Sequence, residues 1–151
     1  MKPVLFLRIA SVLTLIHAVL HTIGGVFGTP SPGVATTVAA IMRSRFPAMG
    51  VMRSYSDFYR GMGLSVSIFL TAEAIAFWLL ASLARSDAAR LRPVLAIFAL
   101  GYLALAVNSY AFFFAAPVIV EAVIAICLGA AIFTASSSAE NAIPVTGPTS
   151  T

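Results

Sequence analysis

The fold of this chain follows from the stretch at residues 61–83, which reads GMGLSVSIFLTAEAIAFWLLASL. The charged side chain in it is that of Glu73, and the other residues are apolar, small or hydroxylated. An α-helix needs about 20 mainly apolar residues to cross the hydrocarbon core of a bilayer. This stretch is therefore predicted to be a transmembrane helix.

Three further segments have the same character, and each is bounded by helix breakers or by charged residues. The sequence therefore predicts four transmembrane helices, at about 4–26, 61–83, 93–114 and 117–135. A very tight turn at residues 115–117 predicts that the last two helices form an antiparallel hairpin. The expected fold class is all-α, an integral membrane four-helix bundle with a long first loop.

The composition of the whole chain supports lipid as the main solvent. Hydrophobic residues make up 60% and charged residues 9% of the 151 residues, and the mean hydropathy is +1.01. A soluble domain has about 25% charged residues, so this chain has too few charges for a surface that faces water. The net charge of +4 suits lipid headgroups, and no basic stripe or aromatic platform points to nucleic acid.

The two segments outside the predicted helices differ in character. The first loop, residues 28–60, is predicted to contain a short interfacial helix at about 34–42, which lies against the bilayer or caps the bundle. The tail, residues 136–151, is rich in Ser, Thr, Pro and Gly, and this composition predicts disorder. The 151 residues then form one transmembrane domain followed by a tail.

A helix start is predicted at the end of the long loop. Ser54 and Asp57 have the spacing of a capping box, in which each side chain accepts a hydrogen bond from the backbone of the other residue. Arg60 follows Asp57 by three residues, so the two are expected to form an ion pair at the membrane interface.

Five polar side chains are predicted to lie within the membrane: His17, His21, Glu73, Asn108 and Glu121. An ionisable group at a helix centre costs roughly 2.5–3.5 kcal/mol, so each one needs a reason. Counting about 1.5 Å per residue from the helix ends places all five between the midplane and the side of the long loop. They are therefore the candidate lining of a polar pocket. Glu73 fits least well, because it points away from the stripe of small residues on its helix, which is Gly63, Ser67 and Thr71.

Simpler roles remain open for the same residues. The two histidines could serve only to form hydrogen bonds between helices. Glu121 could be a protonated carboxyl that is bonded to Asn108 or His21 and serves only helix packing. Two histidines one turn apart on one helix cannot ligate opposite faces of one haem iron. His17, His21 and Glu121 are suitable metal ligands, but their spacing is a weak signal. We expect neither a metal nor a cofactor, and the single cysteine, Cys127, permits no intramolecular disulfide.

Three functions fit this pattern, and no enzyme class is assigned. The first is a membrane protein with a polar pocket for a small apolar or amphiphilic, lipid-like molecule. The second is a proton-coupled protein that uses the buried Glu and His side chains. The third is an accessory subunit, or a homo-oligomer, whose small-residue stripes pack against partner helices.

Two short motifs carry a resemblance. His17–Gly25, which reads HAVLHTIGG, and Asp57–Gly63, which reads DFYRGMG, resemble a group of uncharacterised small bacterial integral membrane proteins with four helices. The resemblance implies a multi-pass protein of the bacterial inner (plasma) membrane and brings no known activity. A looser similarity to DoxX-like proteins concerns the architecture alone. A small excess of Lys and Arg on the side of the termini favours both termini in the cytoplasm.

Overall fold

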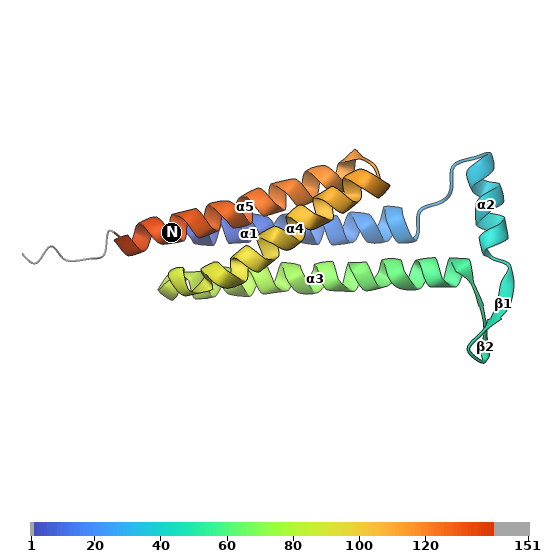
Figure 1. The fold of residues 1–151 in the computed structure, drawn as a ribbon, viewed down its shortest axis with the longest axis horizontal. Helices are drawn as coiled ribbons and strands as arrows, with labels where there is room; N and C mark the ends of the chain where they lie inside the picture. The colour runs from blue at the N-terminus through green and yellow to red at the C-terminus, as the bar shows by residue number, and fades with distance from the viewer. Residues whose placement is uncertain (1, 141–151) are drawn as a thin grey trace, which may run out of the picture. The chain divides into compact units, whose positions relative to one another are not determined.

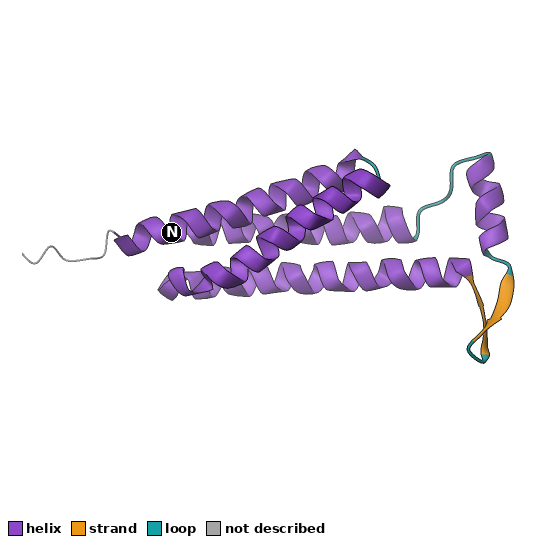
Figure 2. Ribbon diagram, viewed as in Figure 1, coloured by secondary structure: helices purple, strands orange, loops and turns teal. Residues whose placement is uncertain are grey.

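The computed structural model describes residues 2–140, and the side chains as far as residue 135. Helices make up most of this range (Figure 1), and two short strands lie among them (Figure 2). The elements in chain order are α1 (Lys2–Leu20), a π-helical segment (His21–Val26), α2 (Val34–Met42), β1 (Arg45–Ala48), β2 (Val51–Ser54), α3 (Tyr55–Asp87), a 3-10 turn (Ala89–Leu91), α4 (Arg92–Phe112) and α5 (Ala115–Glu140).

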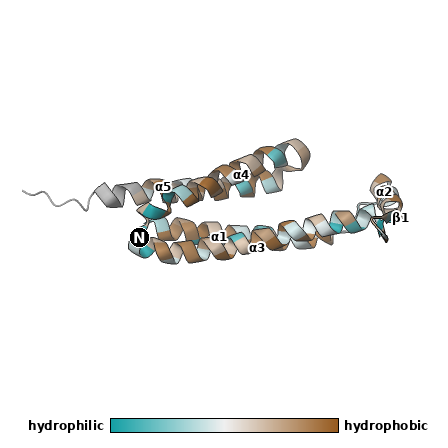
Figure 3. Ribbon diagram, turned by 60° about the horizontal axis from the view of Figure 1, so that its bottom comes forward, coloured by the Kyte–Doolittle hydropathy of each residue, from teal (hydrophilic) through white to brown (hydrophobic). Residues whose placement is uncertain are grey.

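Four helical stretches of the described chain are long and apolar enough to cross a membrane. They are Lys2–Val26, Tyr55–Asp87, Ala89–Phe112 and Ala115–Ala135. In Figure 3 the hydrophobic colour covers much of these helices, whereas the end of α3 next to β1 is pale to hydrophilic. The four apolar helices expected from the sequence are therefore present.

α4 and α5 each begin before a proline rather than at it. α4 starts at Arg92, one residue before Pro93, and α5 starts at Ala115, two residues before Pro117. Proline lacks an N–H group, which the first turn of a helix does not use, so it is tolerated there. The predicted starts at residues 93 and 117 were late for this reason.

The other end of α5 also differs from the expectation. The helix extends to Glu140, past the predicted start of the tail at residue 136. Ala, Ser and Glu continue a helix well enough for another turn once the preceding turns are formed. The remainder of the predicted tail, residues 141–151, lies outside the described residues.

The chain forms two compact units, which are described in turn. The first, called the loop unit, is Thr14–Glu73. The second, called the core unit, comprises the described residues of 2–13 and 74–140.

In the loop unit, the long connection between α1 and α3 is largely ordered. It contains α2 at Val34–Met42, the range for which a short helix is predicted, followed by an antiparallel hairpin of β1 and β2. In Figure 1 α2 runs across the direction of the neighbouring part of α3. The hairpin is not among the elements predicted for the first loop, residues 28–60.

The hairpin has a two-residue turn made by Met49 and Gly50. Both residues have a positive φ, 46° and 86°, which is the pattern of a type I′ turn. Asn-Gly and Asp-Gly are the usual signals for this turn, and Met-Gly is not one of them. Positive φ costs a residue with a Cβ about 1–2 kcal/mol, so Met49 is strained.

In the core unit, large side chains fill the space between the helices. Phe77 of α3 is fully buried, and its ring lies 5.1 Å from that of Phe98 and 6.1 Å from that of Tyr102, both on α4. α4 and α5 pack against each other. The buried set also includes Leu7, Ala10, Ala81, Ala84, Leu95, Ile124, Ala125, Cys127, Leu128 and Ala131.

One polar contact and one cation–π contact join α1 and α3 within the core unit. The hydroxyl of Ser11 donates a hydrogen bond of 2.6 Å to the carbonyl oxygen of Ala74. The guanidinium of Arg8 lies 4.9 Å from the ring centre of Trp78. Arg and Trp are both typical of the membrane–water interface, where such a pair keeps its charge close to water.

Candidate functional site

Two histidines lie on successive turns where α1 changes its helical form. His17 belongs to the last turns of α1, and His21 is the first residue of the π-helical segment. The backbone N–H of Phe27 donates to the carbonyl oxygen of Thr22 at 3.1 Å, which gives the five-residue spacing of a π-helix. Such segments are rare and are frequent at functional sites.

His21 belongs to a group of hydrogen-bonded polar side chains within the loop unit. Its Nδ1 lies 3.1 Å from the hydroxyl oxygen of Ser67 on α3. The hydroxyl of Thr22 lies 2.8 Å from the same Ser67 oxygen. We call His21, Thr22 and Ser67 the hydroxyl–histidine cluster, and its side chains come from two antiparallel helical segments.

The protons of the cluster can be arranged in more than one way. The Thr22 hydroxyl can donate to Ser67 or to the carbonyl of Ala18, which is 2.7 Å away. The Ser67 hydroxyl can donate to the carbonyl of Gly63, at 3.2 Å, or to the imidazole. When Nδ1 of His21 carries a proton, it donates to Ser67 instead. The cluster therefore satisfies either neutral tautomer of His21.

Glycines provide the space that the imidazole occupies. A Cβ on Gly63 would lie 2.8 Å from a methyl carbon of Val26 and 3.9 Å from Cε1 of His21. A Cβ on Gly25 would lie 3.3 Å from Cδ2 of the same ring. The hydroxyl of Tyr59 donates to the carbonyl of Gly25 at 3.3 Å and ties α3 to the π-helical segment.

His17 has an unused polar atom. The residue is partly buried, and its Nδ1 is buried with no hydrogen-bond partner among the described residues. A buried polar atom without a partner costs about 1–3 kcal/mol, so such atoms are uncommon and usually have a reason. This nitrogen is available to a ligand or a proton one turn from the cluster.

The five residues of the predicted pocket divide between the two units. His17, His21 and Glu73 belong to the loop unit, whereas Asn108 and Glu121 belong to the core unit. Glu73 is partly buried on α3. The loop unit adds Thr22 and Ser67, which are not among the five predicted residues. Ser67 had a detectable signal, because it follows Gly63 by one turn on a stripe of small residues.

Glu121 has a different partner from the two that were expected. In the core unit it is 5% exposed, and it accepts a hydrogen bond from the side chain of Ser109 on α4. Its Oε2 is buried and has no partner among the described residues. Asn108 is exposed. Consecutive residues of a helix point about 100° apart, so Asn108 and the buried Ser109 lie on different faces of α4. The adjacent Ser109, on the buried face of α4, takes the place predicted for Asn108.

The start of α3 has the geometry of a capping box. The backbone N–H of Ser54 donates to Oδ2 of Asp57 at 2.9 Å, and that of Asp57 donates to the hydroxyl of Ser54 at 3.2 Å. α3 therefore begins at Tyr55 rather than at residue 61, and it continues to Asp87.

The expected ion pair of Asp57 with Arg60 is not formed. Asp87 and Arg90 do form an ion pair, at 3.1 Å. The cations whose charges act on Asp57 are Arg45 and Arg53 of the hairpin. These two arginines were not expected near Asp57, because the hairpin that carries them was not predicted from the sequence.

Within residues 2–140 no group of three or more His, Cys, Asp or Glu side chains has a metal-binding arrangement. In comparisons with known proteins, no family model, curated protein or solved structure matches this chain. The chemistry of the site itself is therefore what indicates a function.

Proposed function

We propose that this chain is a multi-pass protein of a bacterial inner membrane that binds the polar end of a small amphiphilic molecule at the hydroxyl–histidine cluster. The observation that carries the proposal is the linked group of His21, Thr22 and Ser67 between two apolar helices. Polar groups at membrane depth are costly and commonly mark a binding site or a pathway.

The cluster favours a headgroup that contains oxygen. The imidazole and both hydroxyls can donate and accept hydrogen bonds, which suits a carboxylate, a hydroxyl or a carbonyl. The neighbouring side chains Val19, Leu20 and Ile23 are exposed and apolar, so a hydrocarbon tail can lie beside them. His17 would supply a second polar contact through its free Nδ1.

Photolabelling tests the proposal. A photoreactive, clickable analogue of a long-chain fatty acid is added to membranes that contain the full chain, and labelled peptides are identified by mass spectrometry. We expect labels around residues 17–27 and 63–71, and a several-fold loss of label in Ser67→Ala. Replacing Ser67 removes the hydroxyl that joins the two helices.

Ser82→Ala is the matched control. Ser82 of α3 also donates to the carbonyl one turn earlier, that of Trp78 at 3.4 Å, but it is exposed and outside the cluster. Its labelling should equal that of the unchanged protein. Equal labelling of the Ser82 and Ser67 variants, or labels spread over all four helices, would contradict the proposal.

Proton coupling is a second candidate function. It is favoured by the ability of the cluster to satisfy either tautomer of His21, with His17 one turn away. In proteoliposomes loaded with a pH-sensitive dye, His21→Phe should abolish proton flux. Flux unchanged in His21→Phe would exclude this function.

A further inference from the structure

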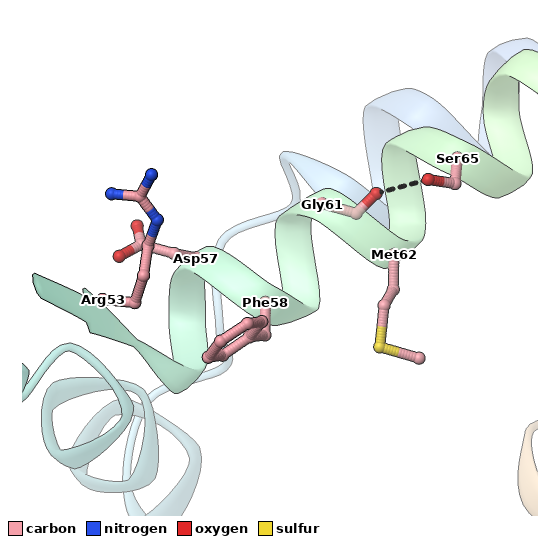
Figure 4. A pocket seen from close by; sticks show the side chains of 6 residues that line it. All are labelled: Arg53, Asp57, Phe58, Gly61, Met62 and Ser65. Atoms are coloured by element: carbon pink, nitrogen blue, oxygen red, sulfur yellow. Dashed lines mark hydrogen bonds between the residues drawn. The ribbon is translucent and has the colours of Figure 1, made fainter. Parts of the chain in front are cut away.

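A groove lies on α3 next to the hairpin, away from the hydroxyl–histidine cluster. Its volume is about 380 Å³, within the usual range of about 300–1,000 Å³ for small-molecule sites. The lining residues, all in the loop unit and drawn in Figure 4, are Arg53, Asp57, Phe58, Gly61, Met62 and Ser65.

The groove has a hollow at Gly61, because glycine has no side chain to fill it. Asp57, Gly61 and Ser65 follow one another at four-residue steps along one row of α3, and Phe58 and Met62 form the next row. A Cβ on Gly61 would meet no atom within 4 Å, so the space above it is open. The hydroxyl of Ser65 is turned back to the carbonyl of Gly61, as Figure 4 shows, and leaves this space free.

Opposite charges lie at the hairpin end of the groove. Arg53 of β2 uses one N–H group for the carbonyl of Met52, at 3.2 Å, out of the five that a guanidinium offers. Asp57 uses Oδ2 for the backbone of Ser54, and its carboxylate can accept further hydrogen bonds. Both charged groups line this end of the groove (Figure 4), and the charge of Arg53 acts on the Asp57 carboxylate. The groove thus presents one cation and one anion side by side.

The rest of the groove is apolar and leads away from the charges. Phe58 and Met62 are 47% and 72% exposed, and they form its apolar side. From Asp57 to Ser65 the groove follows α3 for about 12 Å, toward the apolar part of the helix. A ligand that fills it has two opposite charges at one end and hydrocarbon at the other.

We propose that this groove binds a phospholipid with an amine headgroup, of the phosphatidylethanolamine class. The lipid phosphate pairs with Arg53, the ammonium pairs with Asp57, and the first part of an acyl chain lies over Gly61 beside Phe58 and Met62. This site is independent of the cluster at His21, and it goes beyond the function proposed above.

The charge pattern selects this class over its neighbours. A headgroup with a phosphate but no amine, such as phosphatidylglycerol, would leave the Asp57 carboxylate facing another anion. Phosphatidylcholine carries the positive charge, but its quaternary ammonium has no N–H group to donate to that carboxylate. A primary ammonium donates three hydrogen bonds and is compact, so it fits beside the carboxylate.

Native mass spectrometry of the full chain in detergent tests the proposal. Phosphatidylethanolamine, phosphatidylcholine and phosphatidylglycerol with identical acyl chains are titrated separately. We expect the unchanged protein to bind the ethanolamine lipid about tenfold more tightly than the other two, as one charge-assisted hydrogen bond allows. Equal binding of the three, or a preference for either other lipid, would overturn the proposal.

Two charge variants assign the headgroup contacts. Asp57→Asn keeps an oxygen that accepts from the Ser54 N–H group, so the cap is retained while the charge is lost. This variant should lose the preference for the ethanolamine lipid over phosphatidylglycerol. Arg53→Gln should weaken binding of the ethanolamine lipid about tenfold, whereas Arg43→Gln, outside the groove, should leave it unchanged. Identical effects of the two arginine variants would overturn the assignment.

Filling the hollow gives a test that does not depend on charge. Gly61→Leu adds a side chain where no atom is in the way and also favours the helix, so the fold should be retained. It should weaken binding of the ethanolamine lipid about tenfold or more. Gly101→Leu is the control, because Gly101 of α4 is also helical with open space around it. Unchanged binding in Gly61→Leu would overturn the proposal.

Discussion

The helices of the two units are held together by different kinds of contact. In the core unit, large side chains such as Phe77, Tyr102 and Leu128 are fully buried and fill the space between helices. In the loop unit, the close contact of Gly63 with Val26 and the hydrogen bonds of Ser67 join the π-helical segment and α3. The candidate site lies in the loop unit, because the small residues between its helices leave space for polar side chains.

The largest expected effect concerns the core unit. Phe77→Ala removes a fully buried ring that packs on Phe98 and Tyr102, and should lower the free energy of unfolding by about 3–5 kcal/mol. Unfolding of the purified protein in mixed micelles, titrated with dodecyl sulfate, measures this through the fluorescence of Trp78. Phe133→Ala is the control, because Phe133 is 78% exposed. If Phe77→Ala and Phe133→Ala lower the free energy of unfolding by similar amounts, the packing of buried side chains is not the main source of stability in the core unit.

The next effect concerns the close contact in the loop unit. Gly63→Ala places a Cβ 2.8 Å from a methyl carbon of Val26 and should cost about 1–3 kcal/mol in the same unfolding measurement. The double variant Gly63→Ala/Val26→Ala removes that methyl group and should recover part of the loss. Gly61→Ala, which adds a Cβ in open space, should instead stabilise the helix by up to about 1 kcal/mol. A neutral Gly63→Ala would contradict the close contact.

The smallest effect concerns the hairpin of the loop unit. Met49→Asn replaces a residue at φ 46° with one that tolerates positive φ in a type I′ turn, and should add about 0.5 kcal/mol of stability. Protection of the backbone N–H groups of residues 45–54 from hydrogen exchange is the measurement. Met52→Asn, outside the turn, should give no gain. A loss of protection in Met49→Asn would show that Met49 makes a stabilising contact.

Much of the local structure could be predicted from the sequence. Four apolar stretches predicted the long helices, and the spacing of Ser54 and Asp57 predicted the bonds that begin α3. The hairpin could not be predicted in this way. Its strands are four residues long, Pro47 interrupts the first, and the turn lacks the usual Asn-Gly or Asp-Gly.

The candidate site could be predicted only in part. His17 and His21 stand out because ionisable residues are rare in apolar helices. Thr22, Ser67 and Ser109 do not, since a hydroxyl can bond to its own helix and needs no partner elsewhere. Thr22 and Ser67 do bond to their own helices, and they also meet each other and His21.

The sequence by itself determined where the apolar helices are, where α3 is capped and which ionisable groups they carry. Hydrophobicity and capping are local properties of a few consecutive residues, so they can be read from the order of the side chains. Only the tertiary structure decided that Ser67 meets His21, that Ser109 rather than Asn108 meets Glu121, and that Arg53 lies beside Asp57. Those pairings depend on how each helix is rotated and how closely two segments approach, which contacts between distant residues determine.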